Sequence, residues 1–88
     1  MNVAVGEDKL ALVFYGRAKR AEVANDLERQ LVNSELALKH YRESARIFRT
    51  VNQLDRADET LLRAAAVEEL IRNIDAAKAA AAVIKDRG

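Results

Sequence analysis

Four basic residues spaced three or four apart form the pattern in this sequence best suited to binding chemistry. They are Lys39, Arg42, Arg46 and Arg49, and on an α-helix, which rises 1.5 Å per residue, they would form one ridge about 15 Å long. A guanidinium presents N–H donors in a fork that matches a carboxylate or a phosphate. The basic ridge therefore predicts a clamp for an acidic peptide of a partner protein. The alternative is a solvated ridge paired with acids of the same chain, such as Glu43.

No residue set with the spacing of a catalytic or metal site accompanies the basic ridge. His40 is the single histidine, and the chain has no cysteine, whereas a zinc site needs several imidazoles or thiolates. The carboxylates mostly stand beside Lys or Arg at helical spacing, which favours solvated faces over the buried acids that acid–base catalysis requires. A glycine-rich phosphate loop is also absent. We therefore expect no enzymatic activity, no bound metal and no cofactor.

The charge balance bears on the class of partner. Fifteen Lys and Arg stand against fourteen Asp and Glu, which gives a formal net charge of +1. Nucleic-acid binders usually carry a clear basic surplus, because phosphate neutralisation supplies most of their affinity. A protein or peptide partner is therefore expected rather than nucleic acid. Two alternatives stay open: a dimeric nucleic-acid-associated regulator that uses the same arginines, and a purely structural homo-oligomer.

Composition predicts a chain that is helical almost throughout. Proline is absent, the only glycines are Gly6, Gly16 and Gly88, and good helix formers dominate the interval between the last two. Residues 1–6 show no helical period and are expected to form a flexible N-terminal tail. Residues 7–88 are expected to form a single all-helical domain. The predicted fold class is all-α, with three or four antiparallel helices.

Polar capping residues predict the joints between these helices. The first is Asn33-Ser34, because both residues are favoured N-caps, so the second helix would run from residue 35 to about residue 50. The next is residues 52–55, with Asp55 as the N-cap of the third helix. Residues 72–75 leave two readings open. The apolar period continues through them, which favours one long helix, but an Asn and an Asp there favour a turn.

The second predicted helix carries a stripe suited to helix pairing. Small residues, Ala37, Ser44 and Ala45, alternate with the rings of Tyr41 and Phe48 at spacings of three and four. Another helix could approach closely at the small positions while the rings fill the gaps above and below. Tyr41 and Phe48 are therefore expected to be structural.

Residues 33–45, Asn-Ser-Glu-Leu-Ala-Leu-Lys-His-Tyr-Arg-Glu-Ser-Ala, resemble the second helix of a tetratricopeptide repeat. An offset of 40 residues also aligns residues 31–37 with 71–77, as in stacked helical hairpins, although Val32 and Arg72 stand where that family has a turn glycine. The same residues resemble the three-helix microtubule-interacting-and-transport domain, whose second helix has a similar Ala-Leu-x-x-Tyr run. Both resemblances imply a small adaptor or assembly module that binds a partner helix or an acidic peptide.

The alanine-rich end of the chain predicts self-association. Residues 76–84 offer little apolar area per residue but allow very close helix contact, so this end is expected either to pack on the second helix or to pair with a second copy. Self-association, as a symmetric homodimer that buries this face, is the prediction. No uncharged run is long enough to span a membrane, and residues 1–16 lack the pattern of a secretory signal. The chain is accordingly expected to be cytoplasmic.

Overall fold

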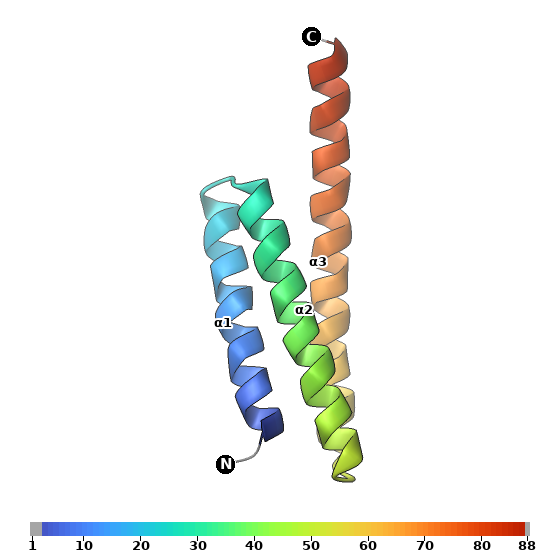
Figure 1. Cartoon of the computed structure of the whole chain (residues 1–88). Helices are drawn as coiled ribbons and strands as arrows, with labels where there is room; N and C mark the ends of the chain where they lie inside the picture. Colours follow the sequence, from blue (N-terminus) through green and yellow to red (C-terminus); the bar gives the residue numbers. More distant parts are fainter. Residues whose placement is uncertain (1–2, 88) are drawn as a thin grey trace.

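Three α-helices make up the part of the chain that the computed structural model describes, which is residues 3–87, with side chains through Lys85 (Figure 1). They are α1 (Val3–Val23), α2 (Leu27–Thr50) and α3 (Leu54–Arg87). Successive helices run antiparallel, and α1 and α3 each pack against α2 much more extensively than against each other. Residues 3–87 contain no strand. The fold is all-α, as predicted, with three helices.

The arrangement is long and open. Its principal extents are 54 × 18 × 13 Å and its radius of gyration is 15.2 Å, against about 12 Å for a closely packed domain of this length. A folded chain of 9.8 kDa typically exposes about 5,200 Å², but this one exposes 6067 Å². The difference, about 900 Å², arises because α1 and α3 cover only α2 and because α3 continues past the turn between α1 and α2 (Figure 1).

Alanine supplies most of the buried core. One cluster surrounds Tyr41 on α2 and a second surrounds Phe48 near the other end of that helix. Small side chains let the helix backbones approach closely, but each buries little apolar area. The buried apolar residues are Ala4, Ala11, Ala18 and Ala21 of α1, Ala37, Tyr41, Ala45 and Phe48 of α2, and Ala57, Ala64, Val67 and Ile74 of α3.

The first connection lies earlier in the chain than the capping residues predicted. α1 ends at Val23, Asn25 adopts the left-handed conformation with φ 58°, and Asp26 is the N-cap of α2. The Asp26 carboxylate accepts a hydrogen bond from the backbone N–H of Arg29 at 3.1 Å. An Asn suited to positive φ, followed directly by an acidic cap, supplies both requirements of a tight helix–helix turn.

The predicted joint at Asn33-Ser34 is therefore wrong, because both residues lie inside α2. The Asn33 side chain donates to the backbone carbonyl of Arg29 at 2.9 Å, a bond made along the same helix. Ser34 is fully buried, so it serves as a small packing residue rather than as a cap. The hairpin turns expected at positions 32 and 72 are likewise absent from α2 and α3.

The other boundaries are closer to expectation. α2 ends at Thr50 as predicted, and Asn52, with φ 60°, turns the chain into α3. Asp55 lies in the first turn of α3 rather than at its N-cap. Residues 72–75 continue α3 as one helix, which decides between the two readings. α1 begins at Val3 and buries Ala4, so residues 3–6 belong to a helix rather than to a tail, whereas residues 1–2 lie outside the described part.

We predict different effects on the free energy of unfolding for a substitution at the observed joint, Asp26, and one at the joint expected from the sequence, Ser34. Asp26→Ala removes the cap of α2 and should lower the free energy of unfolding by about 1 kcal/mol. Ser34→Ala should leave it unchanged or raise it, because the buried Ser34 hydroxyl has no hydrogen-bond partner among the described residues and Ala favours helix. Urea unfolding followed by circular dichroism measures both. A larger loss for Ser34→Ala than for Asp26→Ala would contradict the observed connection.

Candidate interaction surfaces

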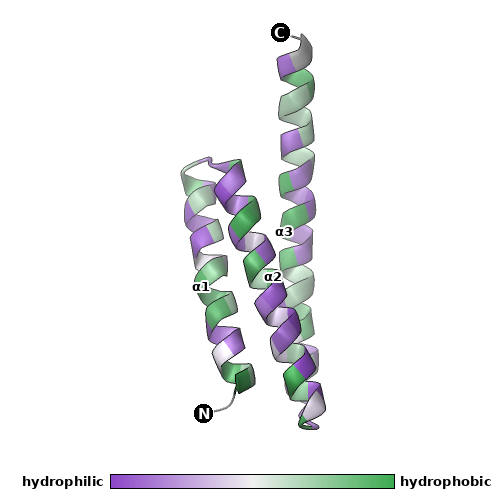
Figure 2. Cartoon of the chain, viewed as in Figure 1, coloured by the Kyte–Doolittle hydropathy of each residue, from purple (hydrophilic) through white to green (hydrophobic). Residues whose placement is uncertain are grey.

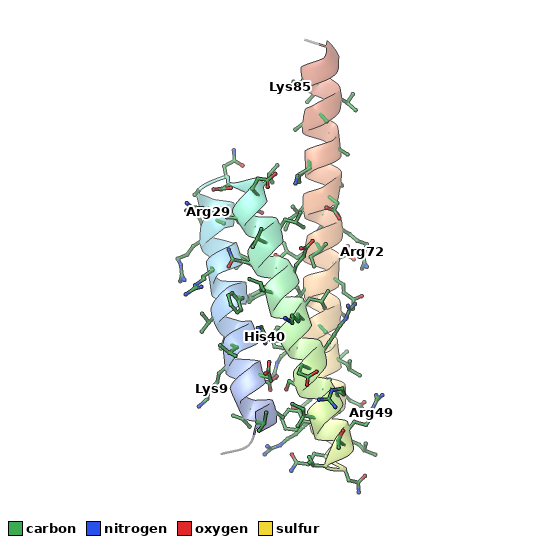
Figure 3. The ribbon with its side chains drawn as sticks, in the orientation of Figure 1. Lys9, Arg29, His40, Arg49, Arg72 and Lys85 are labelled. Atoms are coloured by element: carbon green, nitrogen blue, oxygen red, sulfur yellow. The ribbon has the colours of Figure 1, made fainter. Side chains whose placement is uncertain are left out.

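The basic ridge lies on the exposed side of α2, and half of it is paired within the chain. Arg42 Nη2 lies 3.1 Å from Glu68 Oε1 of α3, and Arg46 Nε lies 3.1 Å from Glu43 Oε2 one turn away. Hydrogen bonding to Arg46 lowers the pKa of the Glu43 carboxyl. Lys39 and Arg49 are exposed and make no ion pair within residues 3–87; Figure 3 shows Arg49 near the C-terminal end of α2. A clamp for an acidic peptide stays a prediction for this ridge.

His40 links α1 to α2. Its Nδ1 pairs with the Glu7 carboxylate, and its ring stacks on Phe14 with centroids 5.5 Å apart and planes within 8°. The side chain is mostly buried, so the histidine is a structural contact between the first two helices rather than a solvated residue. Sequence spacing gave no signal for this, because Glu7 and Phe14 lie on a helix 26 or more residues away from His40.

An apolar groove runs between α1 and α3, with Tyr41 of α2 as its floor. Its central part has a volume of about 240 Å³. Toward the N-terminal end of α1 lies a second hollow at the ion pair of Asp8 with Arg63, and toward the α1–α2 turn lies a third, whose lining includes Glu22 and Ala77. We call these three hollows together the α1–α3 groove. Its central lining residues are Leu12, Tyr15, Tyr41, Arg63, Ala66 and Val67.

The groove contains polar groups that the chain itself does not satisfy. The Tyr41 residue is only 5% exposed; its hydroxyl makes no hydrogen bond within residues 3–87 and keeps contact with solvent at the groove. The Oδ1 atom of Asp8 is also buried without a hydrogen-bond partner among these residues, while Oδ2 lies 3.8 Å from Arg63 Nη1. Buried polar groups are normally paired, and leaving one unpaired costs about 1–3 kcal/mol. A bound molecule that supplied an acceptor to Tyr41 or a donor to Asp8 would therefore gain from this site.

The electrostatics of the groove keep Tyr41 neutral. Burial raises the pKa of the Tyr41 phenol above its ordinary value of 10.0; Arg63 opposes this effect, and the carboxylate of Asp8 and the ring of Tyr15 add to it. At neutral pH the hydroxyl therefore keeps its proton. It can act as a donor as well as an acceptor.

Apolar residues surround α1 on nearly every side. Leu12 is 62% exposed at the rim of the groove, and Val3, Leu10 and Val13 are exposed on other sides of the same helix. Figure 2 shows this apolar character over the N-terminal half of α1. A helix that is apolar all round is usually buried all round. The apolar run of residues 10–15 is the sequence signal that could have indicated the groove.

The C-terminal part of α3 packs against neither of the other helices. Lys78 Nζ pairs with Glu28 Oε1 at 3.1 Å, beside the first residues of α2. Every described side chain after Lys78 is exposed, including Ile84 at 72%. We call residues 79–87 the α3 overhang. It projects beyond the α1–α2 turn (Figure 1), and Figure 3 shows Lys85 on this projecting part.

Comparison with protein-family models, curated proteins and solved structures found no match to this chain. In the described part of the chain, no helix has both the length and the apolar character needed to cross a membrane. Residues 3–87 also contain no group of three or more His, Cys, Asp or Glu side chains placed to hold a metal ion. The groove, the basic ridge and the α3 overhang are thus the surfaces from which function can be inferred.

We predict that Tyr41→Phe leaves stability at neutral pH within about 0.5 kcal/mol of the wild type, because the hydroxyl makes no internal hydrogen bond. At alkaline pH the variant should be the more resistant. Folding raises the pKa of Tyr41 above its ordinary value of 10.0. The folded state therefore holds this proton more tightly than the unfolded state does. The stability that results is fully present below pH 10.0 and is lost as the pH rises through the folded-state pKa.

Thermal unfolding of both proteins, followed from neutral pH to about pH 11, above the ordinary tyrosine pKa, measures the difference. Tyr15→Phe is the matched control, since it removes the other tyrosine and leaves Tyr41 in place. Equal alkaline loss in the wild type and in Tyr41→Phe would show that Tyr41 is not buried as described.

Proposed function

We propose that this chain is a helical protein–protein interaction module that holds an amphipathic helix in the α1–α3 groove. The observation that carries the proposal is the apolar lining of this groove, with the ring of Tyr41 as its floor. Such a surface is suited to binding rather than to catalysis. Apolar walls provide affinity, and a few polar groups fix the orientation of the bound segment.

The dimensions of the groove suit a helix. α1 and α3 form its walls and α2 its floor, so a helix laid along it would complete a four-helix bundle. Along α1 the groove extends from Val5 to Glu22, which corresponds to about 26 Å of helix. An amphipathic helix of nearly five turns could place apolar residues at i, i+3, i+4 and i+7 along this length.

The exposed area agrees with a missing partner. A standard protein–protein interface buries about 800 Å² on each side, which is close to the excess surface of about 900 Å² that this fold carries over a closely packed chain of its mass. Most of the exposed large apolar side chains of the described residues lie on α1 and α3. Covering it would give the chain the burial that its own three helices do not provide.

The sequence resemblances support the same class of function. Both the tetratricopeptide and the microtubule-interacting-and-transport families are helical peptide-binding modules, and the second has the number of helices found here. The internal pairing of Arg42 and Arg46 favours a protein partner over nucleic acid, because a nucleic-acid-associated regulator would need these guanidinium groups for phosphates. Lys39 and Arg49 stay available to an acidic segment that flanks the bound helix.

Site-specific photo-crosslinking in the native host tests this proposal. A photoreactive residue at Leu12, on the rim of the groove, should give a discrete cross-linked product whose attached peptide comes from an amphipathic helix. The matched control is Val32, an exposed apolar residue on α2 (53% exposed, against 62% for Leu12), which should give no such product. Ala66→Glu places a charge in the groove wall and should reduce the Leu12 product at least about tenfold.

The same products at Leu12 and Val32 would contradict the proposal. So would a Leu12 product that survives Ala66→Glu unchanged. Circular dichroism of the Ala66→Glu variant separates loss of binding from loss of folding, and an unchanged spectrum is expected because Ala66 is exposed.

A further inference from the structure

We infer that the helix held in the groove is α3 of a second copy of this chain, laid antiparallel to the first copy's α3. This inference rests on the proposed function and names its partner. In the resulting symmetric dimer, each α3 overhang lies in the other copy's groove. The two features that the single chain leaves uncovered, the groove and the overhang, then cover each other.

The lengths of the two features match. The groove runs along α1 from Val5 to Glu22, and the segment of α3 from Leu70 to the end of the helix at Arg87 has the same number of residues. Each corresponds to about 26 Å of helix. Residues 70–87 of the second copy, which include its overhang, therefore have the length of the groove.

The groove-facing stripe of α3 is self-complementary in the antiparallel direction. It carries Arg63, Ala66, Leu70 and Ala77 beside the groove, and the same helical face continues as Ala81 and Ile84. When Ile84 of one copy lies beside Arg63 of the other, the two-fold axis falls between Asn73 and Ile74. Leu70 then meets Ala77, and Ala66 meets Ala81.

The small side chains of Ala66, Ala77 and Ala81 let the two helices approach closely along this contact. Asn73 would lie beside its own counterpart at the axis. An amide in that position can fix the register of paired helices.

The polar groups of the groove provide a second, independent indication. Asp8, at the N-terminal end of the groove, has a carboxylate oxygen that the described part of the single chain leaves unsatisfied. In the antiparallel register, Lys85 of the second copy comes within about one helical turn of Asp8. The buried Oδ1 of Asp8, which has no hydrogen-bond partner within residues 3–87, then has a cation close to it. The Asp8 carboxylate, which Arg63 approaches from one side, thus receives a second cation.

The area available is sufficient for a stable dimer. Covering about 800 Å² on each copy gives a standard-size interface, and the excess surface of this fold is of that order. Two-fold symmetric dimers are the commonest oligomers, and in them the same surface of each copy is used twice. Each copy contributes both a groove and an overhang, so the same pair of contacts can form twice, once on each side of the two-fold axis.

Sedimentation equilibrium of the full chain at micromolar concentrations tests the inference. The wild type should sediment at twice its mass of 9.8 kDa. Ala77→Glu combined with Ala81→Glu places two charges on the groove-facing stripe, and the dissociation constant should rise at least about 100-fold. The matched control, Ala76→Glu combined with Ala79→Glu, makes the same changes on the outward face and should leave the dimer intact. All four alanines are exposed in the single chain, so circular dichroism should be unchanged in both variants.

Cysteine cross-linking tests the register. The chain has no cysteine, so Asn73→Cys introduces a single thiol near the proposed two-fold axis and should oxidise readily to a disulfide-linked dimer. Asp75→Cys places the thiol on the opposite face of α3 and should not. Equal cross-linking of the two variants would overturn the antiparallel register, as would equal disruption of the dimer by the two pairs of glutamates.

The two proposals fail in different ways. A wild-type chain that stays a monomer, with a Leu12 cross-link to a helix of another protein, would overturn the second copy as partner and leave the groove as a helix-binding site. A monomer without any Leu12-specific product would remove both.

Discussion

Close packing of α1 and α3 against the small-residue face of α2 is the constraint on which the rest of this structure depends. Ala37 and Ser44 of α2 are fully buried, and the Ser44 hydroxyl donates to the backbone carbonyl of Ala4 at 2.9 Å. A side chain reaches a backbone oxygen of the neighbouring helix only where the two helices lie close together. α2 thus holds both other helices, while α1 and α3 share little more than the ion pair of Asp8 with Arg63.

This packing explains why so much apolar surface is left over. Alanine contributes little burial on an area basis, and the larger apolar residues, such as Leu12, Leu62 and Ile84, lie away from α2 and stay exposed. A three-helix chain of this size has a small core in any case. The proposed function is therefore connected with the packing: the apolar surface that the single chain leaves exposed is the surface that a bound helix would cover.

Much of the fold could be predicted from the sequence, because its signals are local. The stripe from Ala37 to Phe48 was expected to pair with other helices, and its small residues and rings are all buried. The end of α2 at Thr50 followed from composition and capping residues. The first connection did not, because Asn33-Ser34 and Asn25-Asp26 have equal local capping potential, and only the packing of Ser34 inside the bundle decides between them.

The groove joins Leu12 to Ala66 across two turns of the chain, and no local pattern records such a contact. For the same reason the basic ridge was visible in the sequence but the partner of Arg42 on α3 was not.

Native-state hydrogen exchange tests most directly whether α2 holds the other two helices. If it does, the central amides of α2, near Ala37 to Ala45, exchange only through complete unfolding, because detachment of either neighbour leaves α2 packed against the other. Amides of α1 and α3 should then show lower free energies of exchange, since each can detach alone. Exchange of the central α2 amides at a lower free energy than those of α1 or α3 would contradict this account.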